Sequence, residues 1–231
     1  QDFEGFWARL AREHLQWSKP FTQTLDESNA PFFQWFGDGE LNASANCLDR
    51  HMGTPNENKT AIIFEADDGA ITRITYKELL ARVSQFANAL LSCGVGKGDR
   101  VLIYMPMIAE AVIAMLATVR IGAIHSVVFG GFAAHSLASR IDDATPRVIV
   151  SADAGSRGGK VIPYKPLLDE ALNLSRHKVD KVVMVHRGLA PAGMVKGRDV
   201  DYRTAREEVM DEVVPCVWVD STHPSYILYT S

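Results

Sequence analysis

A glycine-rich segment that carries two cations contains the residue types best suited to binding a ligand. It reads Gly155-Ser-Arg-Gly-Gly-Lys160, so that Arg157 and Lys160 stand on either side of Gly158 and Gly159. Backbone N–H groups that are free in such a turn can bind an anion together with a guanidinium and an ammonium group. A Walker phosphate loop is excluded, because its lysine is followed by Ser or Thr and a valine stands there in this chain. An anion site and a turn whose cations face water are both compatible with these residues.

A second pair of glycines, Gly130 and Gly131, lies between a predicted strand and a predicted helix. Paired glycines allow a ligand or another part of the backbone to approach the chain closely. They are also typical of a tight connection between two elements. From residue types alone, the tight turn is the preferred interpretation of Phe129-Gly-Gly-Phe132.

The other residues with reactive side chains show no catalytic or metal-binding pattern. The cysteines Cys47, Cys93 and Cys216 are far apart, and none of the 7 histidines has a partner at metal-ligand spacing. His125 lies in an apolar stretch, and we expect it to be a core residue with a structural hydrogen bond. We therefore expect no metal site and no catalytic residue in this sequence.

Apolar residues form strand-like runs that alternate with helix-like stripes, which is the pattern of βαβ units. Strands are predicted at 61–65, 71–75, 100–105, 124–129, 147–151, 181–185 and 226–229, and an Asp-Asp-Gly turn joins the first two as a hairpin. Helices are predicted at 76–91, 108–119, 133–144, 166–174 and 201–213. The expected fold class is α/β, with a mostly parallel sheet flanked by helices. Ligands of such sheets bind outside the carboxyl ends of the strands, here after Phe129, Ser151 and Tyr229.

Residues 1–60 differ in character from the rest of the chain. Their start predicts a short amphipathic helix that ends before Pro20, and aromatic residues then follow among Asn, Gly, Pro and Asp. Aromatic side chains in such irregular segments usually pack onto a neighbouring core. We expect residues 1–60 to form an N-terminal arm on the core, without a fold of its own, and residues 61–231 to form an α/β subdomain.

Composition restricts the class of protein. The 231 residues are 47% hydrophobic and 23% charged, as in ordinary globular proteins, with a net charge of −4 that offers no general basic surface for nucleic acid. No apolar run approaches the ~20 residues of a membrane span, and the start lacks the layout of a signal peptide. Scattered thiols suit a reducing compartment. We therefore expect a soluble, cytoplasmic protein that binds neither nucleic acid nor a membrane.

Several longer strings of residues are distinctive enough to compare with known families. They are Tyr104-Met-Pro-Met-Ile-Ala-Glu110, His125-Ser-Val-Val-Phe-Gly-Gly-Phe132, Arg140-Ile-Asp-Asp143, Ser151-Ala-Asp-Ala-Gly-Ser-Arg-Gly-Gly-Lys160 and Tyr226-Ile-Leu-Tyr-Thr-Ser231, with Trp17-Ser-Lys-Pro-Phe21 and Cys47-Leu-Asp-Arg-His51 in the arm. Together they resemble the short-chain acyl-CoA synthetases of the adenylate-forming superfamily. The resemblance covers essentially the whole chain, and it implies the N-terminal part of the large domain of these enzymes.

Within that family the chain is more similar to propionate–CoA ligases than to acetate–CoA ligases, which are the alternative. The similarity lies in Ala134-His135, in the Arg-Gly-Gly-Lys order at 157–160 and in Ile162-Pro-Tyr-Lys165. In acetate–CoA ligases, an arginine tends to replace Lys160 and a leucine tends to replace Tyr164.

The resemblance implies a ligase that works in two steps. Propionate and ATP give an acyl-adenylate and pyrophosphate, and the thiol of CoA then gives propionyl-CoA and AMP. In the family, the Arg-Gly-Gly-Lys segment binds the 3′-phosphate of CoA, which implies this role for Arg157, Gly158, Gly159 and Lys160. The same comparison places Gly130 and Gly131 beside the pantetheine of CoA. ATP, CoA and magnesium are the implied cofactors.

The resemblance also implies which parts of the active site come after this sequence. Tyr229-Thr-Ser231 is similar to the start of the loop that holds the ATP phosphates. The acyl pocket, the adenine site, the magnesium ligands and the catalytic lysine of the family come later. We therefore expect residues 1–231 to be an N-terminal fragment of the ligase, without activity of its own.

Two other classes of function stay open. One is a non-catalytic module that binds CoA or a nucleotide. The other is a doubly wound oxidoreductase, and its glycine fingerprint would have to follow a strand and open a helix. Gly94-Val-Gly-Lys-Gly98 instead follows a predicted helix and precedes a predicted strand, which counts against the oxidoreductase.

Overall fold

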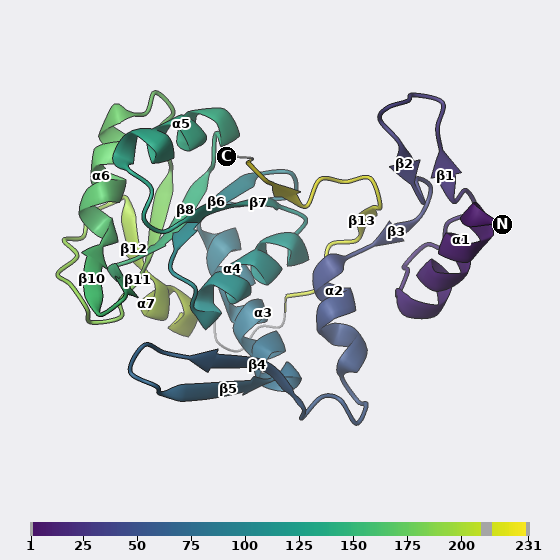
Figure 1. Ribbon diagram of the computed structural model, residues 1–231, viewed down its shortest axis with the longest axis horizontal. Helices are drawn as coiled ribbons and strands as arrows, with labels where there is room; N and C mark the ends of the chain where they lie inside the picture. The colour runs from purple at the N-terminus through teal and green to yellow at the C-terminus, as the bar shows by residue number, and fades with distance from the viewer. Residues whose placement is uncertain (1, 209–213, 230–231) are drawn as a thin grey trace.

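The described part of the chain, residues 2–208 and 214–229 of this computed structural model, is organised around a six-stranded sheet (Figure 1). From one edge to the other, the strands are β12 (Asp199–Asp201), β11 (Lys181–Val185), β8 (Val148–Ala152), β6 (Arg100–Met105), β7 (Ile124–Phe129) and β14 (Tyr226–Ile227). Each neighbouring pair is parallel. The predicted α/β fold class, with a mostly parallel sheet flanked by helices, is therefore confirmed.

Helices cover both faces of this sheet. They are α3 (Tyr76–Ser92), α4 (Ala109–Arg120) and α7 (Tyr202–Glu207) on one face, and α5 (Ala134–Ala144) and α6 (Tyr164–Leu174) on the other. In the central strand β6, Val101 and Ile103 pack in the first core cluster, while Leu102 and Tyr104 pack in the second. Because successive side chains of a strand point to opposite faces, an uninterrupted apolar run needs a helical layer on each side.

The order of the strands places a topological switch point between β6 and β8. From β6 the chain crosses to β7 on one side, and it then returns past β6 to β8 on the other side. Ligands of open parallel sheets bind outside the carboxyl ends of the strands at such a point. The residues that follow Met105 and Ala152 therefore lie where a ligand is expected.

Within residues 60–163, two antiparallel hairpins extend the chain beyond the parallel sheet. The predicted hairpin is confirmed as β4 (Thr60–Glu65) and β5 (Ile71–Thr75). A second hairpin, β9 (Ala154–Arg157) and β10 (Lys160–Pro163), forms where the sequence analysis expected only a glycine-rich turn. The reason lies in Gly158 and Gly159, whose φ angles of 58° and 74° are both left-handed. A two-residue turn of this kind has the twist that connects antiparallel strands.

Small differences from the predicted elements occur near chain bends. Helix α6 begins at Tyr164 rather than at Pro166, because a proline is tolerated in a first turn, where the N–H groups have no partner within the helix. Strand β14 covers 226–227 of the predicted 226–229. Helix α7 accounts for part of the predicted helix 201–213, of which residues 209–213 lie outside the described residues.

The first sixty residues form one longer helix and several short elements. These are α1 (Phe3–His14), where an amphipathic helix is predicted, then β1 (Leu25–Asp26), β2 (Gln34–Trp35), β3 (Glu40–Leu41), α2 (Ala43–Cys47) and the 3-10 helix η1 (Asp49–His51). Strand β3 pairs with β13 (Val219–Asp220). The amide of Asn42 donates hydrogen bonds to the carbonyls of Val119 and Val217. These contacts connect the arm to the body of the molecule, and the division of the chain at residue 60 stays a prediction.

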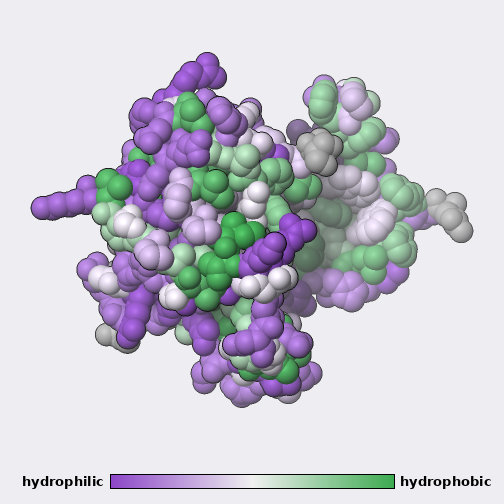
Figure 2. Space-filling view, turned by 60° about the vertical axis from the view of Figure 1, so that its left-hand side comes forward, coloured by the Kyte–Doolittle hydropathy of each residue, from purple (hydrophilic) through white to green (hydrophobic). Residues whose placement is uncertain are grey.

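Aromatic residues of the arm build a small core there. Phe21 clusters with Ala8 and Ala11 of α1, and Trp17 and Phe36 pack against them. This cluster is separate from the two that flank the sheet, so the arm has packing of its own, which the sequence analysis did not expect. In Figure 2 the arm is the lobe at the right, with apolar groups on its surface. Its exposed large apolar side chains are Phe3, Phe6, Trp7, Leu15, Phe32 and Phe33.

No helix in the described ranges, 2–208 and 214–229, is both long enough and apolar enough to cross a lipid bilayer.

Candidate functional site

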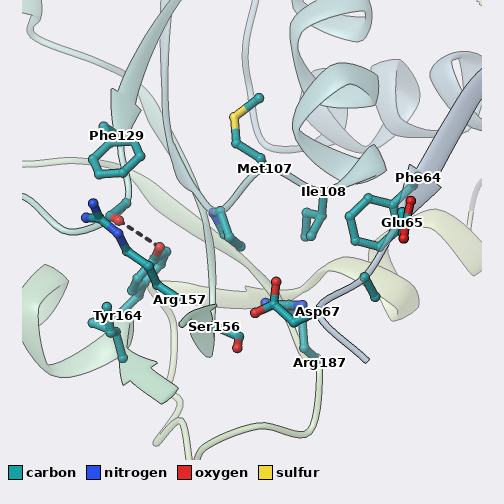
Figure 3. Close-up of a pocket in the computed structure, with 14 residues that line it drawn as sticks. Phe64, Glu65, Asp67, Met107, Ile108, Phe129, Ser156, Arg157, Tyr164 and Arg187 are labelled. Carbon is teal, nitrogen blue, oxygen red and sulfur yellow. Dashed lines mark hydrogen bonds between the residues drawn. The ribbon is translucent and has the colours of Figure 1, made fainter. Parts of the chain in front are cut away.

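A cleft of about 420 Å³ opens at the carboxyl ends of the central strands (Figure 3). Segments that are distant in the sequence form its walls: the β4–β5 hairpin, the residues after β6, the end of β7, the β9–β10 hairpin and the residues after β11. This is the edge of the sheet at which the strand order places a ligand site. The cleft is therefore the candidate functional site of the described chain.

Two of the six residues predicted to bind a ligand, Gly130 and Arg157, line this cleft. The other cation, Lys160, stands directly opposite Arg157 in the register of the β9–β10 hairpin. Side chains of directly opposed residues point to the same face of an antiparallel pair, so the two cations share one face. Both residues are exposed, which leaves their charged groups accessible to a ligand in solution.

The remaining predicted glycines have conformational roles in the structure. Gly158 and Gly159 form the exposed turn of the hairpin, and a Cβ on either would meet no atom within 4 Å. Gly131 follows Gly130 and has a φ of 140° that side-chain-bearing residues rarely adopt. The two interpretations of the Gly130–Gly131 pair thus both apply: it is a tight connection between β7 and α5, and its first glycine faces the cleft.

An aromatic ring adjoins the first cation of the cleft. The guanidinium carbon of Arg157 lies 5.9 Å from the centre of the Phe129 ring, within the range of a cation–π contact. Figure 3 shows Arg157, Phe129 and Tyr164 along one wall, with Phe64 and Glu65 on the other. A ligand with an anionic group and an apolar part would find both kinds of partner in this cleft.

A second guanidinium, that of Arg187, also lines the cleft. Its loop is positioned by a buried carboxylate that was not predicted to be part of the site. Asp153 is 1% exposed and accepts hydrogen bonds from the backbone N–H groups of Ala154, Arg187 and Leu189. These bonds tie the loop after β11 to the end of β8. They place Arg187 at the cleft, where its Nη1 donates to the carbonyl of Ala154 at 3.1 Å.

Asp153 directly follows strand β8, and this position could have indicated from the sequence that its carboxylate binds neighbouring N–H groups. A carboxylate at the end of a buried strand has only backbone N–H groups and nearby cations to satisfy it. Arg187, in contrast, had no local pattern, because its approach to the cleft depends on tertiary hydrogen bonds.

His125 does not have the hydrogen bond that the sequence analysis expected. Its Nδ1 is buried without a hydrogen-bond partner in the described part of the chain, and its ring stacks on Tyr226 at a centroid distance of 5.9 Å. Burial lowers the pKa of His125 to about 4, so the ring is neutral near pH 7. This residue lies in β7, away from the residues that line the cleft, and has a packing role.

Within residues 2–208 and 214–229, no three or more His, Cys, Asp or Glu side chains lie together so that they could hold a metal ion. No residue described here is assigned to magnesium.

Comparisons with known families and solved structures agree with the fold. Residues 48–231 match the family described as "AMP-binding enzyme", and residues 1–47 match "Acetyl-coenzyme A synthetase N-terminus". A solved structure of acetoacetyl-CoA synthetase from Streptomyces lividans superposes with a TM-score of 0.87 at 25% identity. That superposition covers 99% of this chain and 34% of the other.

Curated relatives are closer in sequence. A protein named acetyl-coenzyme A synthetase in Thiobacillus denitrificans is 56% identical over 230 residues, which is 100% of this chain and 35% of the relative. One of the same name in Burkholderia lata is 54% identical over 237 residues, with the same coverage. The chain thus spans about a third of the length of these relatives. Since the family match extends over most of its residues, this chain belongs to the AMP-binding enzymes.

Proposed function

We propose that the full-length protein is an AMP-forming synthetase for short-chain acyl-CoA thioesters. In its first step, the carboxylate of the acid attacks the α-phosphorus of ATP, which gives an acyl-adenylate and releases pyrophosphate. In its second step, the thiol of CoA attacks the acyl carbon, and AMP leaves. The family membership supports this reaction, and the cleft supports a role of this chain in the second step.

The observation that carries the proposal is the pair of cations on one face of the β9–β10 hairpin. CoA has an anionic 3′-phosphate, and Arg157 and Lys160 together can give it charge-assisted hydrogen bonds. In this proposal Gly158 and Gly159 shape the turn between them, and the pantetheine of CoA runs past Gly130 and Gly131. Arg157 and Gly130 both line the cleft at the switch point, so in this proposal one cleft contacts both parts of CoA.

Acetate is the acid best supported by the relatives, whose name is acetyl-coenzyme A synthetase. The propionate preference expected from the sequence rested on Ala134-His135 and on residues 157–165. In the structure these residues lie at the start of α5 and along the β9–β10 hairpin up to α6. Of these residues, Arg157, Ile162 and Tyr164 line the cleft proposed for CoA, so this part of the signal bears on the thiol substrate more than on the acid. We therefore propose acetate as the preferred acid, with propionate as the competing candidate.

The choice between the acids is measured with the full-length enzyme by kcat/KM for acetate and for propionate at saturating ATP and CoA. One methylene in an apolar pocket changes kcat/KM by about 10- to 200-fold. A preference for propionate of that size would replace acetate as the proposed acid and restore the expectation from the sequence.

ATP and magnesium belong to the first step. Their use is proposed from the family, and the residues described here are not assigned to them. The test of the reaction is release of AMP and pyrophosphate that depends on the acid, with thioester formed only when CoA is present. Binding of CoA without any release of AMP would instead support a non-catalytic module, and it would refute the synthetase proposal.

A further inference from the structure

The hydroxyl groups of two tyrosines donate hydrogen bonds to the connection between β7 and α5. The hydroxyl of Tyr164 donates a hydrogen bond of 2.9 Å to the carbonyl of Gly130, shown dashed in Figure 3. The hydroxyl of Tyr104 donates one of 3.3 Å to the carbonyl of Phe132. The two rings pack with centroids 5.1 Å apart. Both ends of the Gly130–Phe132 connection are thus fixed by side chains that come from other elements.

Tyr164 also fills the space between this connection and the β9–β10 hairpin. A Cβ on Gly130 would lie 2.1 Å from the Tyr164 hydroxyl oxygen, and a Cβ on Gly155 would lie 2.4 Å from the same oxygen. Contacts below 3.0 Å essentially never occur for real Cβ atoms, so both backbones need glycine to approach the ring. Gly155 belongs to the hairpin that carries Arg157, so one side chain sets the spacing of two walls of the cleft.

The position of Tyr164 is itself well determined. It is the first residue of α6, its backbone N–H donates to the carbonyl of Asp153 at 2.9 Å, and the residue is 3% exposed. Burial raises the pKa of Tyr104 to about 12 and raises the pKa of Tyr164 as well. Both hydroxyls therefore remain protonated near neutral pH and can donate the bonds described.

We propose that Tyr164 is a positioning residue for the thiol substrate: it fixes the distance between the Gly130 wall and the Arg157 wall, and thereby prepares the cleft for a long, flexible, phosphate-bearing thiol. This inference rests on the proposed function, which assigns CoA to the cleft. When the walls of the cleft are already ordered in the free protein, the free-energy cost of ordering them is not paid on binding. The hydroxyl of Tyr164 should matter for CoA and not for formation of the acyl-adenylate.

The test uses Tyr164→Phe in the full-length enzyme, because this change removes the hydroxyl and keeps the ring. We expect the KM for CoA to rise about 3- to 10-fold, as for loss of one buried hydrogen bond, with ATP–pyrophosphate exchange unchanged. Tyr76→Phe is the matched control, since Tyr76 lies at the start of α3, outside the residues that line the cleft, and should leave both measurements unchanged.

Hydrogen–deuterium exchange at the β7–α5 connection supplies a readout that does not depend on turnover. The N–H of Phe132 donates to the carbonyl of Phe129, and Tyr164→Phe should make it exchange several-fold faster. An unchanged KM for CoA in Tyr164→Phe would overturn the proposal, as would an equal loss in pyrophosphate exchange and thioester formation. Failure of the proposed function is recognised separately, because then the unmodified enzyme itself would show no CoA-dependent release of AMP.

Discussion

Arg157 and Lys160 face each other across the β9–β10 hairpin, and only Gly158 and Gly159 separate them in the sequence. The left-handed φ angles of the two glycines bring the chain back on itself within two residues. Opposed in this way, the two cations lie on one face, at the mouth of a cleft that Arg157 lines. The turn at Gly158 and Gly159 thus brings the two cations of the motif together on one surface.

A side chain at Gly159, the second glycine of the β9–β10 turn, should destabilise the hairpin. Gly159 has a φ of 74° and open space around a Cβ, so Gly159→Ala meets no clash but places a side-chain-bearing residue in the left-handed region. We expect a loss of about 1 kcal/mol in the free energy of unfolding and a higher KM for CoA. Gly193→Ala is the control, because its Cβ would also meet open space and its φ is not left-handed. Equal effects of the two changes in denaturant titrations would show that the turn geometry is unimportant.

A buried charge network should stabilise the layer formed by α6. The fully buried carboxylate of Asp199 contacts Lys165 at 3.1 Å and Arg198 at 2.5 Å, and both cations also contact Asp169. Asp199→Asn leaves the buried Lys165 short of one partner, and we expect it to lower the free energy of unfolding by about 3 kcal/mol. Asp180→Asn removes a carboxylate from an exposed pair with Arg147 and should cost less than about 1 kcal/mol. Urea unfolding of both full-length variants measures the difference.

The same network gives a dependence of stability on pH. Burial alone would raise the pKa of Asp199, but the hydrogen bonds from Arg198, Val195 and Lys165 outweigh it, and the pKa is lowered. A carboxyl whose pKa is lowered by folding adds stability above its unfolded pKa of about 3.9, and this stability disappears as the pH falls through the folded value. The stability gap between the unmodified protein and Asp199→Asn should therefore narrow with acidification in that range. A gap that stays constant down to the acid transition would contradict the pairing.

The arm should depend on one buried arginine for its attachment. Arg120 of α4 is 1% exposed and binds Asp49 of η1 through two nitrogens, at 2.8 and 3.0 Å. Its Nε also donates to the carbonyl of Val214 at 2.6 Å. A lysine cannot form this planar, two-pronged contact, so Arg120→Lys should lower the free energy of unfolding by about 1.5–3 kcal/mol.

Limited proteolysis distinguishes attachment of the arm from general stability. Cleavage within residues 1–60 should become faster in Arg120→Lys under native conditions. Arg9→Lys changes an exposed pair within α1 and should leave the cleavage rate unaltered. Equally fast cleavage of the arm in both variants would show that the ion pair between Arg120 and Asp49 does not attach the arm to the body of the molecule.

Five of the six strands of the sheet could be predicted from their apolar residues. The edge strand β12 could not, because Asp199-Val-Asp201 has no apolar run. The second hairpin could not, since residues 154–163 mix Ala, Gly, Ser and two cations without the alternation that indicates a strand. The glycine pair at 158–159 was compatible with several turns, and only its pairing partners identify a hairpin. Local patterns therefore predicted the framework of the fold and left this part of the site undetermined.

Residues that depend on tertiary contacts were the ones missed. Tyr164 looked like a marker of one branch of the family, yet its ring lies between two glycines that are 25 residues apart in the sequence. Arg187 is brought to the cleft by backbone bonds to Asp153, a residue 34 positions earlier. No spacing rule links such residues, because the strand order of the sheet determines which loops meet.

The most direct test of the CoA site removes a phosphate from the ligand as well as a charge from the protein. Lys160→Ala in the full-length enzyme should raise the KM for CoA about tenfold, or about 1.4 kcal/mol, and leave ATP–pyrophosphate exchange unchanged. With dephospho-CoA, which lacks the 3′-phosphate, the same change should have little effect. Lys77→Ala removes an exposed charge from α3 and should affect neither thiol substrate. If Lys160→Ala instead penalised CoA and dephospho-CoA equally, Lys160 would not contact the 3′-phosphate, and the assignment of the hairpin to CoA would be wrong.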